Sequence, residues 1–104
     1  MTIIVKSEII ISKGFETWKT MVHAMSGKLR TMGISFLFAG TAQDDPTKLV
    51  AVMRFDSMDV LKSFGADEEL TEKRREAGAV IESGVMTIMS DDFFTNYPEP
   101  FIKN

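Results

Sequence analysis

The side chains that could carry out chemistry in this sequence are few and widely spaced. His23 is the only histidine, and no residue near it offers a second metal ligand. At 100° per residue it lies about 120° from the centre of the apolar stripe of its predicted helix, so we expect it to be exposed. The acidic pairs Asp44-Asp45 and Asp91-Asp92 are adjacent in sequence and therefore point apart on a strand, which excludes a two-carboxylate acid–base unit. The lack of cysteine excludes disulfides, thiolate metal sites and cysteine nucleophiles. We predict no metal site and no cofactor, and the catalytic residues are unknown.

Charged residues beside the predicted strands have a structural and a functional interpretation. Glu8, Arg54 and Asp91 could form a carboxylate–arginine contact that balances charge at a buried sheet face or a dimer interface. Ligand orientation or proton transfer is the alternative role. The basic run Lys73–Arg75 is flanked by four glutamates, and we interpret it as a solvated helix face rather than a site for polyanions.

The composition indicates one globular domain. The chain has 104 residues, 44% of them apolar, and a formal net charge of −3. We predict a single domain over 1–104, with 95–104 as an irregular tail because Pro98 and Pro100 preclude regular structure there. The charge provides no broad attraction to nucleic acid or anionic membranes, and no apolar run approaches the ~20 residues that span a bilayer. Without cysteines or a secretory leader, we expect a cytoplasmic protein with no nucleic-acid or membrane partner.

The periodicity of apolar residues predicts the order β-α-β-β-α-β, which is the ferredoxin-like α+β arrangement with a four-stranded antiparallel sheet. The first helix has Ser12 as a plausible N-cap and Gly33 as its stop. Gly65 should break the second, and a further surface helix over Asp67–Ala77 should follow and end at Gly78. The predicted strands are Thr2–Ile11, Ile34–Thr41, Lys48–Phe55 and Val85–Ser90, the helices are Phe15–Met32 and Ser57–Ala79, and the turn between the middle strands is Gln43–Pro46.

The first predicted helix carries an apolar stripe that faces the sheet. If a pocket exists, we expect it between this helix and the sheet, lined by Trp18, Val22 and Met25, with Phe64 of the second helix at its edge. Thioethers adapt to varied apolar ligands, although ordinary core filling is the alternative role for the methionines. The methionines in question are Met21, Met25, Met53, Met86 and Met89.

The two middle strands are apolar on both faces, whereas helices in this fold cover only one face of the sheet. The other face is too apolar to meet water, so something else must cover it. A second copy of the same sheet is the simplest cover. The sequence therefore predicts a homodimer formed through the sheet faces.

The whole pattern resembles the dimeric α/β-barrel superfamily, and within it small members of unknown function. The features that match are the element order, the Phe15–Lys19 entry to the first helix, the Asp45-Pro46 turn and the Phe55–Ser57 segment before the second helix. The resemblance covers Thr2 to about Phe94. It implies a homodimer with sheets face to face and a pocket between sheet and helices. Its characterised members include cofactor-independent monooxygenases, haem-degrading enzymes, muconolactone isomerase-like enzymes and stress-responsive proteins.

The sequence departs from the enzymes of this superfamily. The haem-degrading branch is recognised by an Asn, Trp and His set, but Trp18 and His23 are both on the first helix and the asparagines are in the tail. The Tyr, Trp and Asn grouping of the quinone-forming monooxygenases is also missing, because the sole tyrosine is Tyr97. We therefore predict a dimeric α/β-barrel protein that binds a small apolar or aromatic molecule without an identifiable catalytic set. A cofactor-independent monooxygenase-like enzyme is the alternative.

Overall fold

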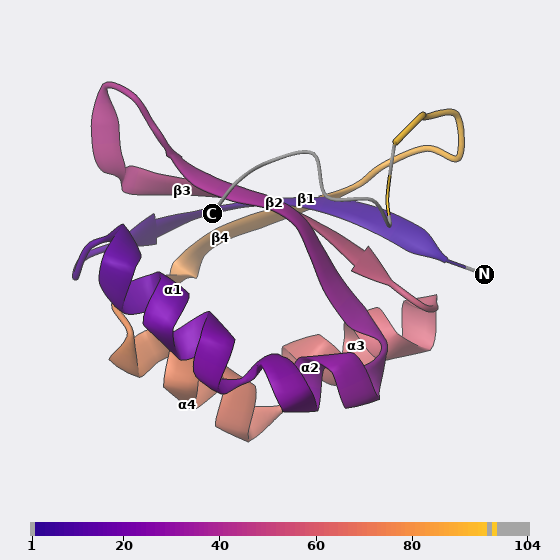
Figure 1. Ribbon diagram of the computed structural model, residues 1–104, viewed down its shortest axis with the longest axis horizontal. Coiled ribbons are helices and arrows are strands. Elements are labelled where there is room, and N and C mark those ends of the chain that lie inside the picture. Colours follow the sequence, from indigo (N-terminus) through magenta and orange to yellow (C-terminus); the bar gives the residue numbers. More distant parts are fainter. Residues whose placement is uncertain (1, 96, 98–104) are drawn as a thin grey trace.

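The computed structural model describes residues 2–95 and Tyr97. Within this part of the chain, one antiparallel sheet has the strand order β2-β3-β1-β4, and the helices lie on one of its faces (Figure 1). The predicted ferredoxin-like α+β fold is therefore confirmed. In chain order the elements are β1 (Ile3–Ile11), α1 (Phe15–Ala24), α2 (Ser26–Met32), β2 (Ile34–Ala42), β3 (Asp45–Phe55), α3 (Met58–Ala66), α4 (Glu68–Glu76) and β4 (Ala79–Ile88).

The predicted first helix is divided into α1 and α2 at Met25, which has φ −96° and ψ 4°. Its N–H is shared between the carbonyl oxygens of Met21 and Val22, at 3.0 and 3.1 Å. Ser26 and Gly27 follow directly, and such a pair of weak helix formers is a common cause of a kink. The expectation of one continuous helix was therefore wrong.

The caps at the two ends of this helical segment differ in how well the sequence predicted them. Ser12 does not cap α1, because Gly14 occupies the N-cap position and the Ser12 hydroxyl donates to the Gly78 carbonyl oxygen at 3.2 Å. Gly33 ends α2 in the left-handed conformation, with φ 88°, as predicted.

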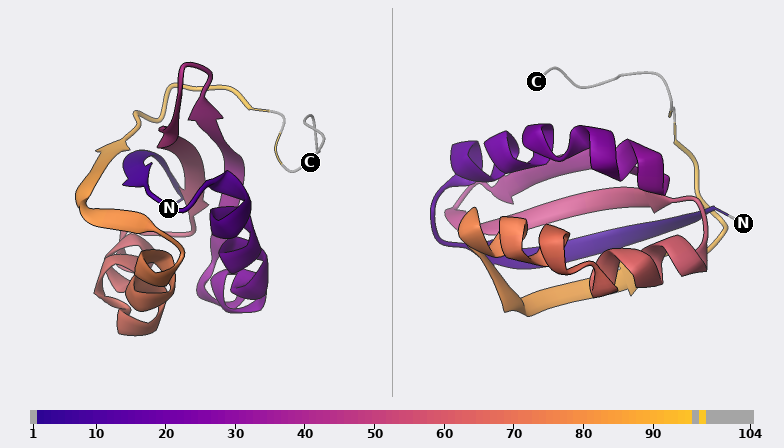
Figure 2. Two further views of the ribbon diagram at one scale, coloured as in Figure 1. Left: turned by 90° about the vertical axis from the view of Figure 1, so that its left-hand side faces the viewer. Right: turned by 90° about the horizontal axis from the view of Figure 1, so that it is seen from below.

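The predicted division of the second helical segment is confirmed, with α4 in place of the further helix predicted over Asp67–Ala77, but the break is at Asp67 rather than at Gly65. The Asp67 carboxylate accepts a hydrogen bond from the Leu70 N–H at 2.9 Å and so caps α4. Ser57 caps α3 by accepting from the Val60 N–H at 3.2 Å. Both breaks let the helices follow the twisted sheet as two pairs, α1–α2 and α3–α4, which lie side by side over one face (Figure 2).

The starts of β3 and β4 differ most from the predicted strand boundaries. The turn between β2 and β3 is only Gln43-Asp44, so Pro46 lies inside β3. The pairing of β1 with β3 ends at Lys48, so Pro46 lies in a part of β3 that has no β1 neighbour, where a proline is tolerated. Strand β4 begins at Ala79, well before the predicted Val85, because its pairing with β1 continues across an irregularity. At that irregularity the Ser83 hydroxyl accepts from the Ile10 N–H at 2.9 Å.

The core fills the space between the sheet and the helices. Val5, Ala51, Met53 and Phe55 form part of the inner sheet face, and each is at most 3% exposed. A shift in the β2–β3 register makes Leu37 the extra residue of a bulge. The core residues contributed by the helices are Trp18, Met25, Leu29, Phe64 and Leu70.

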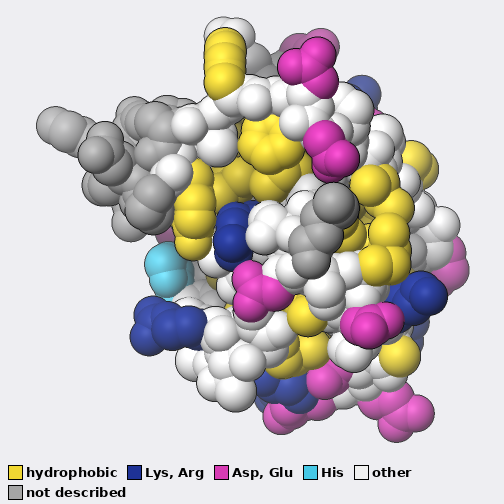
Figure 3. Space-filling model, turned by 90° about the vertical axis from the view of Figure 1, so that its right-hand side faces the viewer, with side chains coloured by type: hydrophobic (Ala, Val, Ile, Leu, Met, Phe, Trp, Pro, Cys, Tyr) yellow, Lys and Arg dark blue, Asp and Glu magenta, His cyan; other side chains and the backbone are white. Residues whose placement is uncertain are grey.

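The outer face of the sheet carries exposed apolar side chains. The exposed fractions are 41% for Phe38, 40% for Val80, 48% for Ile10 and 56% for Val85. Tyr97 packs on this face, with its ring 5.2 Å from the Arg54 guanidinium and its hydroxyl 3.5 Å from that of Ser35. Figure 3, which views the end of the molecule where the amino terminus lies, shows hydrophobic side chains at the surface among charged ones.

The expected contact between Glu8 and Arg54 was wrong. The β1–β3 register places Ile4 opposite Arg54 and Glu8 opposite Val50, so the two charges are too far apart along the strand. Arg54 lies 3.0 Å from the Asp56 carboxylate instead, and Glu8 lies 3.7 Å from the Lys6 ammonium group. Among the described residues, no helix is long and apolar enough to cross a membrane, and no cluster of three metal-ligating side chains occurs.

Candidate functional site

A cavity of about 30 Å³ lies between the helices and the inner face of the sheet. Both helix pairs and all four strands contribute to its wall. Most of the lining side chains are apolar, which is typical of small-molecule sites. The lining residues are Ser7, Ile9, Trp18, Met21, Val22, Met25, Leu29, Phe36, Leu49, Ala51, Met53, Phe64, Leu70, Arg74, Ala79 and Met86.

The structure brings together the four residues that the sequence singled out for a pocket. Trp18, Val22, Met25 and Phe64 all line this one cavity. The Trp18 ring is held in place by neighbouring aromatic rings. Its centroid lies 6.0 Å from that of Phe15 in a stacked arrangement and 5.6 Å from that of Phe36 in an edge-on one.

Four of the five methionines that the sequence singled out also line the cavity. Met21 and Met25 come from the α1–α2 side, Met53 from the centre of the sheet and Met86 from β4. Met89 does not, since it lies beyond β4 and is 44% exposed. Unbranched thioether side chains change rotamer readily, so this part of the wall can reshape around a ligand.

His23 does not contribute to the cavity. It is exposed on α1, as its position off the apolar stripe predicted. The cavity wall contains no histidine, carboxylate, lysine or tyrosine from the described part of the chain. Within the described residues, the polar side chains that line the cavity are those of Ser7, Trp18 and Arg74.

Sequence reasoning missed Arg74. The interpretation of Lys73–Arg75 as a solvated helix face is right for Lys73 and Arg75, which are exposed, but wrong for Arg74, which is partly buried and lines the cavity. The helical period contains the signal, because Arg74 follows the buried Leu70 by four residues and precedes the buried Ala77 by three. The guanidinium lies 5.0 Å from the centroid of the Phe64 ring. Burial lowers the pKa of this guanidinium.

The sequence matches the profile of a domain family over residues 2–91, and the description of that family is "Domain of unknown function (DUF3764)". This match spans most of the chain. The chain belongs to the DUF3764 family. No curated protein sequence matches it.

Solved structures with the same fold come from proteins with very different sequences. SnoaB, a cofactor-independent oxygenase from Streptomyces nogalater, has a TM-score of 0.64 at 8% identity, and the alignment covers 94% of this chain and 98% of SnoaB. Rv0793 from Mycobacterium tuberculosis has a TM-score of 0.60 at 15% identity, and the alignment covers 86% of this chain and 94% of Rv0793. An antibiotic biosynthesis monooxygenase has a TM-score of 0.56 at 17% identity, and the alignment covers 86% of this chain and 97% of the monooxygenase. At these identities the likeness shows the fold alone, so this DUF3764 protein shares the ferredoxin-like fold of these structures.

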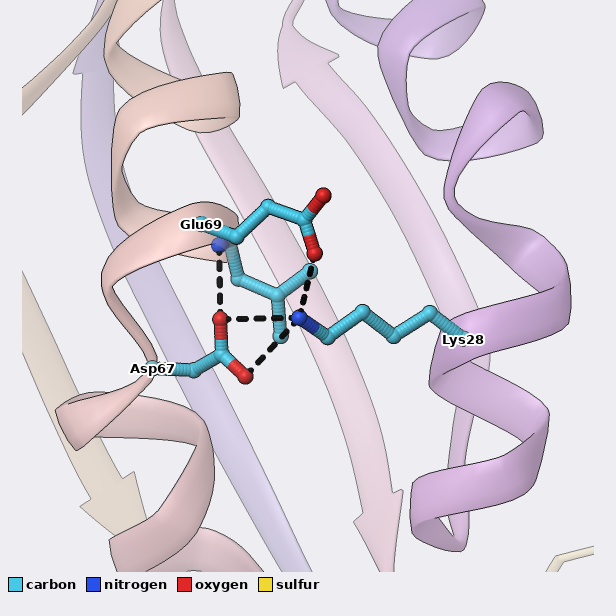
Figure 4. Close-up of polar contacts among 4 residues, drawn as sticks. Lys28, Asp67 and Glu69 are labelled. Carbon is cyan, nitrogen blue, oxygen red and sulfur yellow. Dashed lines mark hydrogen bonds and ion pairs between the residues drawn. The ribbon is translucent and has the colours of Figure 1, made fainter.

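In the DUF3764 protein an ion-pair cluster joins the two helix pairs that cover the cavity. The Lys28 ammonium group on α2 lies 3.0 Å from Oδ2 of Asp67 and 2.6 Å from Oε1 of Glu69 (Figure 4). Hydrogen bonds to Glu69 and Asp67 raise the pKa of Lys28. The Leu70 N–H, and then Lys28, lower the pKa of Asp67. The cluster therefore favours the arrangement in which α2 and α4 lie close together.

Proposed function

We propose that this DUF3764 protein binds a small apolar or aromatic molecule in the cavity between its helices and its sheet, and that it acts as a homodimer. The observation that carries the proposal is the convergence of Trp18, Val22, Met25 and Phe64 on one cavity whose lining is otherwise largely aliphatic and thioether. Such a lining is suited to the body of an apolar ligand.

Binding requires the cavity to enlarge. A volume of about 30 Å³ accommodates little more than a water or two, whereas an apolar cavity that takes benzene measures about 150 Å³. Two features of the wall permit enlargement. The four lining methionines have flexible side chains, and the two helix pairs can separate if the Lys28 cluster opens.

The homodimer is supported by the apolar outer face of the sheet. Ile10, Phe38, Val80 and Val85 are each at least 40% exposed there, on the side that the helices leave open. A second copy of the same sheet offers a matching apolar surface from β1, β2 and β4. Obligate dimers of this kind bury on the order of 2,000 Å² or more.

A cofactor-independent monooxygenase-like enzyme is the second candidate, and the likeness in fold to SnoaB favours it. An enzyme of this class needs a group that takes up a proton from the substrate, and such a base must be within hydrogen-bond reach. The polar lining groups of the described chain are Ser7, Trp18 and Arg74, which mainly donate hydrogen bonds. This composition supports binding over catalysis. Oxygen uptake in the presence of polycyclic phenols would favour the enzyme instead.

The methionines provide a direct test of binding. The chain has eight, and their methyl groups can be labelled with ¹³C and followed by NMR during titration with toluene, indole and naphthalene. We expect the methyl signals of Met21, Met25, Met53 and Met86 to shift, whereas that of Met58, 40% exposed at the start of α3, should not. Shifts confined to Met58 and Met89, which do not line the cavity, or no shifts at all, would contradict the proposal.

A further inference from the structure

Arg74 is a charged side chain in the wall of an apolar cavity, and no partner within the described residues balances its charge. No carboxylate of residues 2–95 lies within 4.0 Å of its guanidinium nitrogens. No hydrogen bond of this side chain occurs within the same part of the chain either. Its neighbours differ, since Arg75 lies 3.2 Å from Glu72 and Lys73 lies 4.0 Å from Glu76. A partly buried cation without a counter-charge is costly unless a ligand supplies one.

The geometry leaves the hydrogen-bonding edge of this guanidinium available. The Phe64 ring, 5.0 Å away, lies against the guanidinium and contributes a cation–π contact. The guanidinium N–H groups have no hydrogen-bond acceptor among the described residues, and they form a fork that fits a carboxylate with two parallel hydrogen bonds. Arg74 can therefore keep its contact with Phe64 and bind an anion at the same time.

The other polar groups of the cavity are also able to donate. Neither the Ser7 hydroxyl nor the Trp18 indole N–H has a hydrogen-bond partner among the described residues. Each keeps some accessible surface, because no fully buried side-chain nitrogen or oxygen of the described chain is unsatisfied. Ser7 is the polar residue on the inner face of β1, where Val5 and Ile9 flank it. A wall of three donors and no carboxylate suits a ligand that carries acceptors.

We propose that the ligand is an apolar or aromatic carboxylic acid, with its carboxylate bound by Arg74 and its body among the methionines and Trp18. This inference rests on the proposed function, because it specifies the chemistry of a ligand of the same cavity. The single positive charge of Arg74 is balanced by one negative charge on the ligand. A dianionic phosphate would leave excess charge in an apolar wall, so a monocarboxylate fits better.

The test compares acids with their amides, which have nearly the same shape and no charge. Phenylacetate, 3-phenylpropionate and octanoate are each paired with the corresponding amide, and affinities are measured by calorimetry at pH 7.5. A charge-assisted hydrogen bond contributes enough that we expect each acid that binds to bind about tenfold or more tightly than its amide. Equal affinities would overturn the role of Arg74 while leaving the proposed function intact. No binding of any acid or amide would contradict both.

Variants then assign the preference to one side chain. In Arg74→Gln we expect the affinity for the acids to fall to that for the amides, with amide binding unchanged. Arg75→Gln is the matched control, since this neighbouring arginine is exposed and paired with Glu72, and it should keep the preference. A preference that persists in Arg74→Gln would overturn the inference. If that variant does not fold, the wild type provides the test by NMR, where the Nε–H signal of Arg74 should shift on addition of an acid and not of its amide. A signal that shifts with the amide alone, or with neither, would overturn the inference.

Discussion

The ammonium group of Lys28 on α2 lies 3.0 Å from the carboxylate of Asp67, the residue at which α3 ends and α4 begins. One ion pair therefore connects the two helix pairs, and the same carboxylate caps α4 by accepting from the Leu70 N–H at 2.9 Å. Because Asp67 has both roles, its protonation should loosen the helix layer.

The first prediction concerns the dependence of stability on pH. The pKa of Asp67 is lowered from 3.8 in the folded protein, so its contribution to stability is present above that pH and is lost as the pH falls through the lowered folded value. In Asp67→Asn the amide oxygen can still cap the helix, but the charge is gone. We expect the wild type to melt at a higher temperature than the variant at pH 6, and this difference should shrink below pH 4.

Thermal melts of both proteins between pH 2.5 and 7 provide the measurement. Asp92→Asn is the matched control, because Asp92 is exposed and forms no ion pair among the described residues, and its melting temperature should follow that of the wild type. A difference between wild type and Asp67→Asn that stays constant with pH would show that the carboxylate charge of Asp67 does not stabilise the fold.

The second prediction tests the dimer. Phe38→Glu places a charge on the outer face of β2, where Phe38 is 41% exposed opposite Val52. Burying an unpaired carboxylate in an apolar interface is costly, so we expect a shift from dimer to monomer at micromolar concentration in sedimentation equilibrium. Lys62→Glu, on the exposed side of α3, should remain dimeric. A wild-type protein that is monomeric under these conditions would refute the proposed assembly.

The third prediction is an expected lack of effect. His23 is exposed on α1 and does not line the cavity, so His23→Ala should change the free energy of unfolding by no more than about 0.5 kcal/mol. Affinity for apolar probes should also stay within about twofold of that of the wild type. Denaturant unfolding and probe titration measure the two quantities. A large loss of binding would assign a role to this histidine that its position does not suggest.

The fourth prediction uses the size of the cavity. Val22→Ile adds one methylene to the cavity wall, and burial of a methylene stabilises by about 0.8 kcal/mol where space exists. We therefore expect Val22→Ile to be as stable as the wild type or slightly more so, and to bind apolar probes more weakly. Val22→Trp exceeds the 30 Å³ available and should destabilise by about 1–3 kcal/mol or more. A clear loss of stability in Val22→Ile would mean that this position is already fully packed.

Elements that depend on local pattern could be predicted from the sequence. The periods of apolar residues determined the number of strands, their order along the chain and the sheet-facing stripe with Trp18, Val22 and Met25, because each period follows from backbone geometry alone. Gly33 and Gly78 stop their segments at positive φ for an equally local reason. The predicted pocket residues meet in one cavity because the helical stripe has only one surface, the sheet, on which to pack.

Other features were decided by tertiary packing. The break at Asp67 depends on the Leu70 N–H and on Lys28, which is 39 residues away, so local propensity pointed to Gly65 instead. The separation of Glu8 from Arg54 follows from a strand register that composition does not specify. Arg74 belongs to a charged run that looks solvated, and only the packing of α4 beside Phe64 partly buries this one side chain. The sequence by itself determined the fold and one wall of the cavity, whereas the polar chemistry of that cavity came from contacts between distant segments.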